Sequence, residues 1–153
     1  MIAPHPDPLR SRDDLTIEAA SHLAWVEGIE QLAVHVASEH GLDADSACFL
    51  GVAVREALVN AIQHGHGFEP GRRVRVGMRI DRARSRLIVT VRDRGPGFEP
   101  ASVPDPLAPE NLTRSSGRGI LLMRRLTDRV GFSFPPGGGT RVRLEKRLPR
   151  RAA

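Results

Sequence analysis

Residues 55–65 have the sequence Arg55-Glu56-Ala57-Leu58-Val59-Asn60-Ala61-Ile62-Gln63-His64-Gly65. Apolar and polar residues recur here every three to four positions, and the stretch contains no proline. This pattern predicts the C-terminal half of a helix. Because four residues advance an α-helix by slightly more than one turn, Glu56, Asn60 and His64 form one polar ridge. The apolar residues that are expected to face a core on the opposite side are Val54, Leu58 and Ile62.

The ridge pairs a carboxylate with a carboxamide one turn later. The carboxylate of Glu56 can take up a proton as a general base. The carboxamide oxygen of Asn60 can bind a hard cation such as Mg²⁺, which prefers oxygen ligands. The alternative is a solvated polar face without chemistry, and this helix alone leaves both interpretations open.

The size and composition predict a single soluble domain. The chain has 153 residues, of which 40% are hydrophobic and 27% are charged, and it is long enough to bury a core. No apolar run approaches the roughly 20 residues that cross a bilayer, and the N-terminus lacks a signal-peptide pattern. We therefore expect a cytoplasmic protein that does not bind a membrane. Cys48 is the only cysteine; this argues against a disulfide framework, and we expect Cys48 in the core.

The net charge of +5 comes almost wholly from arginine, because Lys146 is the only lysine. That lysine does not follow a glycine-rich turn, which excludes a P-loop. A basic protein can bind nucleic acid. However, the arginines are spread along the sequence, aromatic residues make up only 4%, and no nucleic-acid-binding motif is present. We therefore interpret the charge as a dispersed solvated surface and expect no direct nucleic-acid partner.

Hydrophobic periodicity predicts the remaining elements. They are an edge strand at 15–18, helices at 21–40 and 44–64, antiparallel strands at 73–80 and 87–92, a short helix at 120–126, and a closing hairpin with strands at 130–134 and 140–144. Leu23 is expected on the apolar stripe of the first helix. Gly41 is expected to end that helix, and Asp43 to cap the next one.

This order of elements predicts an α+β fold. The expected architecture is a two-layer sandwich, with helices on one face of a mixed, largely antiparallel sheet. Residues 14–147 are expected to form the domain, between a flexible tail at 1–13 and a basic tail at 148–153. The proline-rich stretch at about 99–116 is expected to form a lid or to be disordered, because long structureless loops in compact domains are usually one or the other.

Two glycine-rich stretches provide candidate binding residues. Asp93, at an expected strand end, can accept a hydrogen bond from an amine such as that of adenine, and Gly95 and Gly97 let the backbone turn tightly and approach a flat ligand. The run Gly117-Arg118-Gly119 precedes a helix and offers backbone N–H groups, the positive helix end and a guanidinium to a phosphate. Each stretch alone also occurs in ordinary turns.

The combination of these motifs is more specific than any one of them. A Glu-x-x-x-Asn helix, Asp-x-Gly-x-Gly-Phe after a strand, Gly-x-Gly before a helix and Gly-Gly-Thr before a last strand occur in this order. The set resembles the ATP-binding fold shared by gyrase, Hsp90, histidine kinases and MutL. Within that superfamily, residues 56–65 and 117–123 are most similar to the serine-protein kinase anti-sigma factors of bacterial partner-switching systems. The resemblance covers about residues 14–147.

The resemblance implies an ATP- and Mg²⁺-dependent serine-protein kinase that phosphorylates an anti-sigma-factor antagonist. A sigma factor and a second copy of the chain, in a homodimer, are further implied partners. Glu56 would activate the substrate serine, and Asn60 would hold Mg²⁺ between the phosphates. Asp93 would bind the adenine amine, and Thr140 would lie near adenine through its hydroxyl. The full implied nucleotide-binding set is Asn60, Asp93, Gly95, Gly97, Gly117, Arg118, Gly119 and Thr140. Ordinary structural roles remain open for Thr140 and His64.

Three other functional classes were weighed against the kinase. An ATP-binding regulatory module could switch partners without significant kinase activity, but a pure binder needs no base at Glu56. The catalytic domain of a histidine kinase is disfavoured, because His22 is followed by Leu-Ala-Trp and lacks the acidic residue and proline expected at a phospho-accepting histidine. A nucleic-acid binder is supported by net charge alone.

Overall fold

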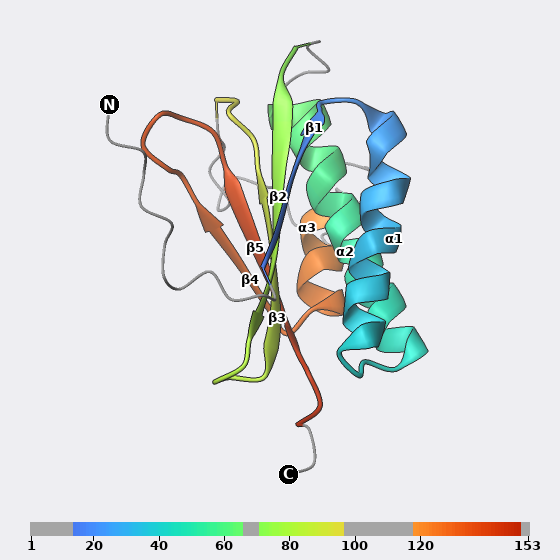
Figure 1. Ribbon diagram of the computed structural model, residues 1–153. Helices are drawn as coiled ribbons and strands as arrows, with labels where there is room; N and C mark the ends of the chain where they lie inside the picture. Colours follow the sequence, from blue (N-terminus) through green and yellow to red (C-terminus); the bar gives the residue numbers. More distant parts are fainter. Residues whose placement is uncertain (1–13, 66–70, 97–117, 151–153) are drawn as a thin grey trace, which may run out of the picture.

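The computed structural model describes residues 14–65, 71–96 and 118–150. These residues form a two-layer sandwich, in which the α-helices cover one face of a five-stranded sheet (Figure 1). The predicted α+β class is confirmed. The predicted tail at 1–13 and the predicted lid at 99–116 lie outside the described residues.

The sheet has the strand order β1-β2-β3-β5-β4, and each neighbouring pair is antiparallel. Its strands are β1 (Leu15–Ala20), β2 (Arg73–Asp81), β3 (Arg86–Arg92), β4 (Arg129–Ser133) and β5 (Arg141–Arg147). The edge strand, the central pair and the closing hairpin are therefore present as predicted. The hairpin of β4 and β5 joins the sheet through β5, which pairs with β3 on one side and with β4 on the other.

The helices follow the predicted order with three differences at their ends, the first being that the helix predicted at 21–40 becomes α-helical only at Val26. They are α1 (Val26–Glu39), which follows the 3₁₀ turn η1 (Leu23–Trp25), then α2 (Ala44–Asn60), the π-helical turn η2 (Ala61–Gly65), and α3 (Arg118–Leu126). The predicted helix at 44–64 thus changes from α to π after Asn60, and the last helix begins at Arg118 rather than at 120.

The predicted signals between α1 and α2 are confirmed. Gly41 has φ of +92°, a left-handed conformation that glycine adopts easily at a helix end. The Asp43 carboxylate accepts a hydrogen bond of 2.8 Å from the N–H of Ser46, which caps α2. The bond from the Ser46 N–H is the largest cause that lowers the pKa of Asp43, and a second bond from the Ser46 hydroxyl adds to it. The pKa of Asp43 is therefore below 3.8.

The core lies between the helices and the inner face of the sheet. Val54, Leu58 and Ile62 are buried as predicted. Along β2 and β3 the inward side chains are apolar and buried, in the alternation typical of a sheet with one covered face. Each fully buried aliphatic side chain contributes about 1.5–3 kcal/mol to stability. Among the described residues, no helix is long and apolar enough to cross a membrane.

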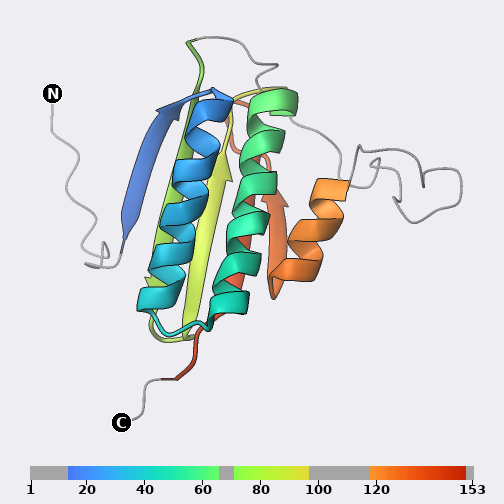
Figure 2. The same ribbon diagram turned by 90° about the vertical axis from the view of Figure 1, so that its right-hand side faces the viewer.

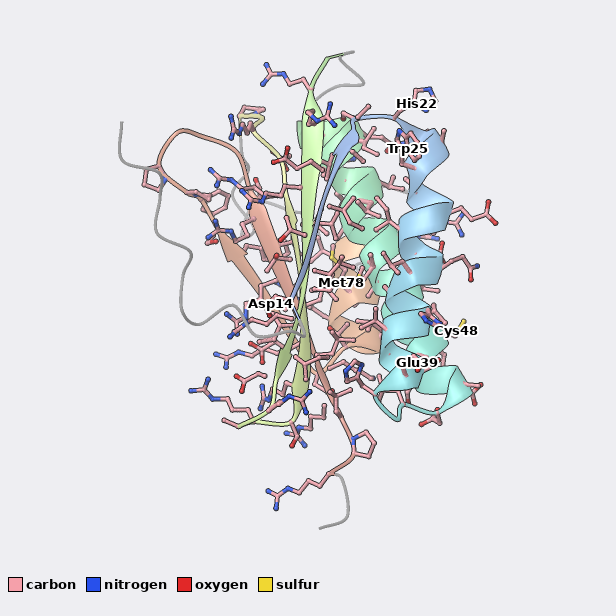
Figure 3. The ribbon with its side chains drawn as sticks, viewed as in Figure 1. Asp14, His22, Trp25, Glu39, Cys48 and Met78 are labelled. Atoms are coloured by element: carbon pink, nitrogen blue, oxygen red, sulfur yellow. The ribbon has the colours of Figure 1, made fainter. Side chains whose placement is uncertain are left out.

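Two predicted core positions are wrong. Leu23 is 44% exposed, because it belongs to η1 and lies before the helical stripe of α1 begins. Cys48 is also exposed, and Figure 3 shows it on the side of the helices away from the sheet. The buried positions of α2 include Ala47, Leu50 and Gly51, so that Cys48 falls on the solvent side of the helix.

Candidate functional site

Glu56 and Asn60 lie near the end of α2, where α3 packs against that helix. An added Cβ at Gly119 would lie 2.8 Å from Oε2 of Glu56 and 3.5 Å from Nδ2 of Asn60. The second residue of α3 therefore sits directly against both polar side chains. The fold therefore brings together Glu56, Asn60 and Gly119, which come from two motifs far apart in the sequence and were predicted to form one site.

The start of α3 lies beside this pair. The first N–H groups of an α-helix have no partner within the helix and attract negative charge. The exposed Arg118 is the first residue of α3. Because Gly119 has no side chain, the backbone can approach Glu56 and Asn60 closely. The arrangement offers a carboxylate, a carboxamide and a helix N-terminus within a small space.

The chain winds differently after Asn60. The π-helical turn η2 begins at the next residue, and such turns occur frequently at functional sites. His64 lies in this turn and is exposed. The ridge predicted for Glu56, Asn60 and His64 assumed a continuous α-helix, and the α-helix ends at Asn60, so the place of His64 on the ridge stays a prediction.

Asp93 is fixed by reciprocal bonds with Thr140. The N–H of Asp93 donates to the carbonyl oxygen of Thr140 at 3.0 Å, and the N–H of Thr140 donates to Oδ1 of Asp93 at 3.3 Å. The N–H of Gly95 also donates to Oδ1, at 2.9 Å. Both Asp93 and Thr140 are buried. Within the described residues, both hydrogen bonds to the carboxylate go to Oδ1, so Oδ2 is the oxygen that a ligand could use.

The two parts of the candidate site, Glu56 with Asn60 and Asp93 with Thr140, lie toward the same end of the molecule. The end of α2 (green) and the end of β3 (yellow), which Asp93 follows, point the same way in Figures 1 and 2. In Figure 2, α3 (orange) starts beside the upper part of α2. Gly97 and Gly117 lie outside the described residues, so their predicted roles stay predictions.

Residues 19–146 match the family model described as the histidine kinase-like ATPase domain. The chain belongs to this family. Membership implies ATP binding, in agreement with the resemblance found in the motifs.

A solved structure has a similar fold to this ATPase domain. It is "The crystal structure of the RsbU and RsbW domains of Rv1364c from Mycobacterium tuberculosis", with a TM-score of 0.58 at 19% sequence identity. The match covers 91% of this chain and 33% of the other, so this chain spans about a third of that chain's length. At this identity the likeness shows a shared fold. No curated protein matches the sequence significantly.

The donor set of this histidine kinase-like ATPase domain is compatible with Mg²⁺. Among the residues that the structure describes, no group of three or more His, Cys, Asp and Glu side chains could hold a metal ion. Mg²⁺ commonly binds through one or two protein oxygens together with water and substrate phosphates. The carboxamide oxygen of Asn60 suits that mode.

The structure adds Gly139 to the residues that shape the site. Its φ is +86°, and a Cβ there would lie 2.6 Å from the Cα of Arg94 and would also clash with the carbonyl oxygen of Asp93. Glycine is therefore required both by the backbone conformation and by the close approach. The glycine run before Thr140 is the sequence signal for this close approach, although the Gly-Gly-Thr motif alone does not show which segment Gly139 contacts.

Proposed function

We propose that this chain is an ATP- and Mg²⁺-dependent serine-protein kinase that phosphorylates an anti-sigma-factor antagonist and binds a sigma factor in partner switching. The observation that carries the proposal is the contact of Gly119 with both Glu56 and Asn60. The family supports ATP binding. The similar fold of a chain with an RsbW domain supports this choice within the family.

Glu56 has the chemistry and the access for a general base. In the proposed step, the serine hydroxyl oxygen bonds to the γ-phosphorus, and the bond from that phosphorus to the β,γ-bridging oxygen breaks. ADP leaves with the bridging oxygen, and the hydroxyl proton passes to the Glu56 carboxylate. The side chain of Glu56 is half-buried, and its Oε2 faces the bare backbone of Gly119.

The other predicted residues would hold the nucleotide. Oδ2 of Asp93 would accept a hydrogen bond from the adenine amine, while Oδ1 keeps its bonds to Gly95 and Thr140. The first N–H groups of α3 and the guanidinium of Arg118 would bind phosphate. Asn60 would hold Mg²⁺, which neutralises phosphate charge when bound.

Partner binding is the second half of the proposal. Leu23 and Trp25 are 44% and 55% exposed, and they lie in the same short turn before α1. Figure 3 shows Trp25 at one end of the helical layer. Exposed tryptophan is enriched among residues that carry binding energy. The exposure of Leu23 and Trp25 supports the proposal that this turn is a protein-binding surface, for the homodimer or for the sigma factor.

One specific observation favours a second function, an ATP-binding regulatory module without significant kinase activity. A carboxylate beside a helix N-terminus stabilises the helix electrostatically. Glu56 lies beside the start of α3, so it has a structural role available that needs no proton transfer.

Phosphate transfer by the wild-type chain and by the Glu56→Gln variant separates the two functions. Glutamine preserves the shape of the side chain but cannot take a proton, so phosphate transfer to the antagonist should fall by about 10²–10⁴. ATP affinity should stay nearly unchanged. The measurements are transfer from γ-labelled ATP to candidate antagonists and nucleotide titration. Glu39→Gln, at the exposed end of α1, is the matched control. ATP binding without transfer by the wild-type chain would favour the regulatory module, and full transfer by Glu56→Gln would show that Glu56 is not the general base.

A further inference from the structure

The face of the sheet that points away from the helices is strongly basic. The outward positions of the described strands include nine arginines and three carboxylates. The arginines are Arg73, Arg75, Arg79, Arg86, Arg92, Arg129, Arg141, Arg143 and Arg147, and the carboxylates are Glu18, Asp81 and Glu145. Figure 3 shows many nitrogen-tipped side chains on this face, and no described element covers it. The interpretation of the charge as dispersed over the surface is therefore wrong for the described strands.

Strand register aligns three of these arginines. Arg75 is paired with Arg92, and Arg92 is paired with Arg141 on the next strand. Neighbouring strands lie about 4.8 Å apart, and like charges placed directly opposite destabilise a sheet. Glu18, paired with Arg75 at the edge of the row, is the only carboxylate in it. The fold thus keeps three guanidinium groups side by side at an energetic cost.

At the opposite end of the same face, two carboxylates pair with arginines. Glu145 accepts hydrogen bonds from Arg86 and, at 2.9 Å, from Arg143. Asp81 pairs with Arg84 at 3.3 Å. The end of the face around Arg92 holds one outward carboxylate of the described strands, Glu18, beside four outward arginines, Arg73, Arg75, Arg92 and Arg141.

A pocket of about 330 Å³ lies at this end of the sheet. Its polar lining comprises Glu18, Arg72, Arg73, Arg75, Arg92 and Arg94. Within the described part of the chain, Nε of Arg92 is buried and has no hydrogen-bond partner. A buried donor without an acceptor is unfavourable. An oxyanion in the pocket would supply that acceptor and would relieve the repulsion along the row.

We propose that this arginine pocket docks an acidic segment of a protein partner. Aspartate and glutamate carboxylates would pair with the planar guanidinium groups, which bind such anions in a two-pronged geometry. Arg73, Arg75 and Arg92 of the pocket suit several carboxylates in succession rather than one small ion. The proposal does not depend on kinase activity.

Two other occupants fit the face less well. Nucleic acid is disfavoured because the outward positions of the described strands hold no aromatic side chain on which bases could stack. A second copy of the chain is disfavoured because two faces with a large excess of arginine repel each other. An acidic protein segment meets neither objection.

The test is a titration of the full chain with a fluorescein-labelled oligoglutamate peptide, followed by fluorescence anisotropy. The Arg75→Gln/Arg92→Gln variant should bind at least about tenfold more weakly, since two charge-assisted contacts are lost. The control Arg79→Gln/Arg129→Gln removes the same charge from exposed positions elsewhere on the face and should change affinity less than about threefold. Equal weakening in both variants would overturn the proposal, because net charge alone would explain it.

Two further measurements complete the test. Removing the aligned like charges should leave the thermal stability of Arg75→Gln/Arg92→Gln equal or higher. The variant Arg75→Lys/Arg92→Lys keeps the charge but loses the planar fork, and it should bind with intermediate affinity. Unchanged peptide affinity in the glutamine variant would contradict the proposal. So would tighter binding of duplex DNA than of the peptide, at about physiological salt, if the same substitutions abolish it.

Discussion

Oε2 of Glu56 lies 2.8 Å from the position that a Cβ at Gly119 would occupy. The carboxylate can therefore approach the start of α3 this closely because residue 119 has no side chain. Glycine is otherwise a poor helix former, since in the middle of a helix it costs about 0.5–1 kcal/mol relative to alanine. The close approach explains why the fold accepts that cost, and it leads directly to the first prediction.

Gly119→Ala should disturb the candidate site without unfolding the chain. The new methyl group would push the Glu56 carboxylate, the flexible end of a side chain, away from the start of α3. We expect weaker ATP binding and slower phosphate transfer, measured by nucleotide titration and labelled-ATP assays. Gly28→Ala is the control, because a Cβ at Gly28 in α1 meets no atom within 4 Å. That control should gain about 0.5–1 kcal/mol of stability. Equal ATP affinity in Gly119→Ala and wild type would show that the site does not include this contact.

Asp93→Asn tests the proposed adenine contact. Asparagine can keep an oxygen at the Oδ1 position, where Gly95 and Thr140 donate, but it places a donor group at the Oδ2 position. That group would face the adenine amine, and the lost bond should cost about 1.5–3 kcal/mol, or about ten- to a hundredfold in ATP affinity. Asp81→Asn is the matched control, since Asp81 also accepts a backbone bond, from Arg84, but lies at the far end of β2. Unchanged affinity in Asp93→Asn would remove Asp93 from the site.

Local patterns predicted most of the fold. The strict alternation in residues 73–80 predicted which side chains of β2 are buried, and the structure confirms it. The glycine and the capping carboxylate at Gly41 and Asp43 fixed the boundary between two helices. Cys48 was placed wrongly although the signal was present. Counting back from the buried Val54 in helical steps reaches residues 51, 50 and 47, and not 48.

Features that depend on pairing across the chain could not be predicted from local patterns. The hairpin signal identified β4 and β5, but it did not predict that β5 pairs with β3. The alignment of Arg141 with Arg75 and Arg92 depends on that pairing. The row of three arginines could therefore not be predicted from local patterns. The clash that makes Gly139 obligatory likewise involves Asp93 and Arg94, on a different segment.

Glu145 should make stability depend on pH. Burial alone would raise the pKa of Glu145, but the hydrogen bonds and charges of Arg86 and Arg143 outweigh burial and hold the pKa below 4.5. Because the folded-state pKa is depressed, the stabilisation is present above pH 4.5 and is lost as the pH falls through the folded-state value. Urea unfolding free energies, measured from about pH 7 to pH 3, should fall less steeply for Glu145→Gln than for wild type. Parallel profiles would contradict this assignment.

Cys48 should react as a surface thiol. It is exposed on α2, and accessible cysteines react faster than buried ones. A disulfide reagent such as dithionitrobenzoate should therefore modify the native protein at nearly the rate seen in denaturant. Reaction only after denaturation would instead support the core position that the sequence analysis had predicted.

Asn60→Ala should affect nucleotide binding in a way that Glu56→Gln does not. The carboxamide of Asn60 lies against Gly119 beside Glu56, but it cannot take up a proton at neutral pH and is assigned to Mg²⁺. Removing it should weaken ATP binding in the presence of Mg²⁺ and leave the weaker binding measured with a chelator nearly unchanged. Phosphate transfer should fall together with Mg-ATP affinity, whereas in Glu56→Gln transfer falls alone. Asn60→Asp, which retains an oxygen ligand, should recover much of the metal dependence. If Asn60→Ala lowers ATP affinity equally with Mg²⁺ and with chelator, then Asn60 contacts the nucleotide or supports the fold, and the metal assignment is wrong.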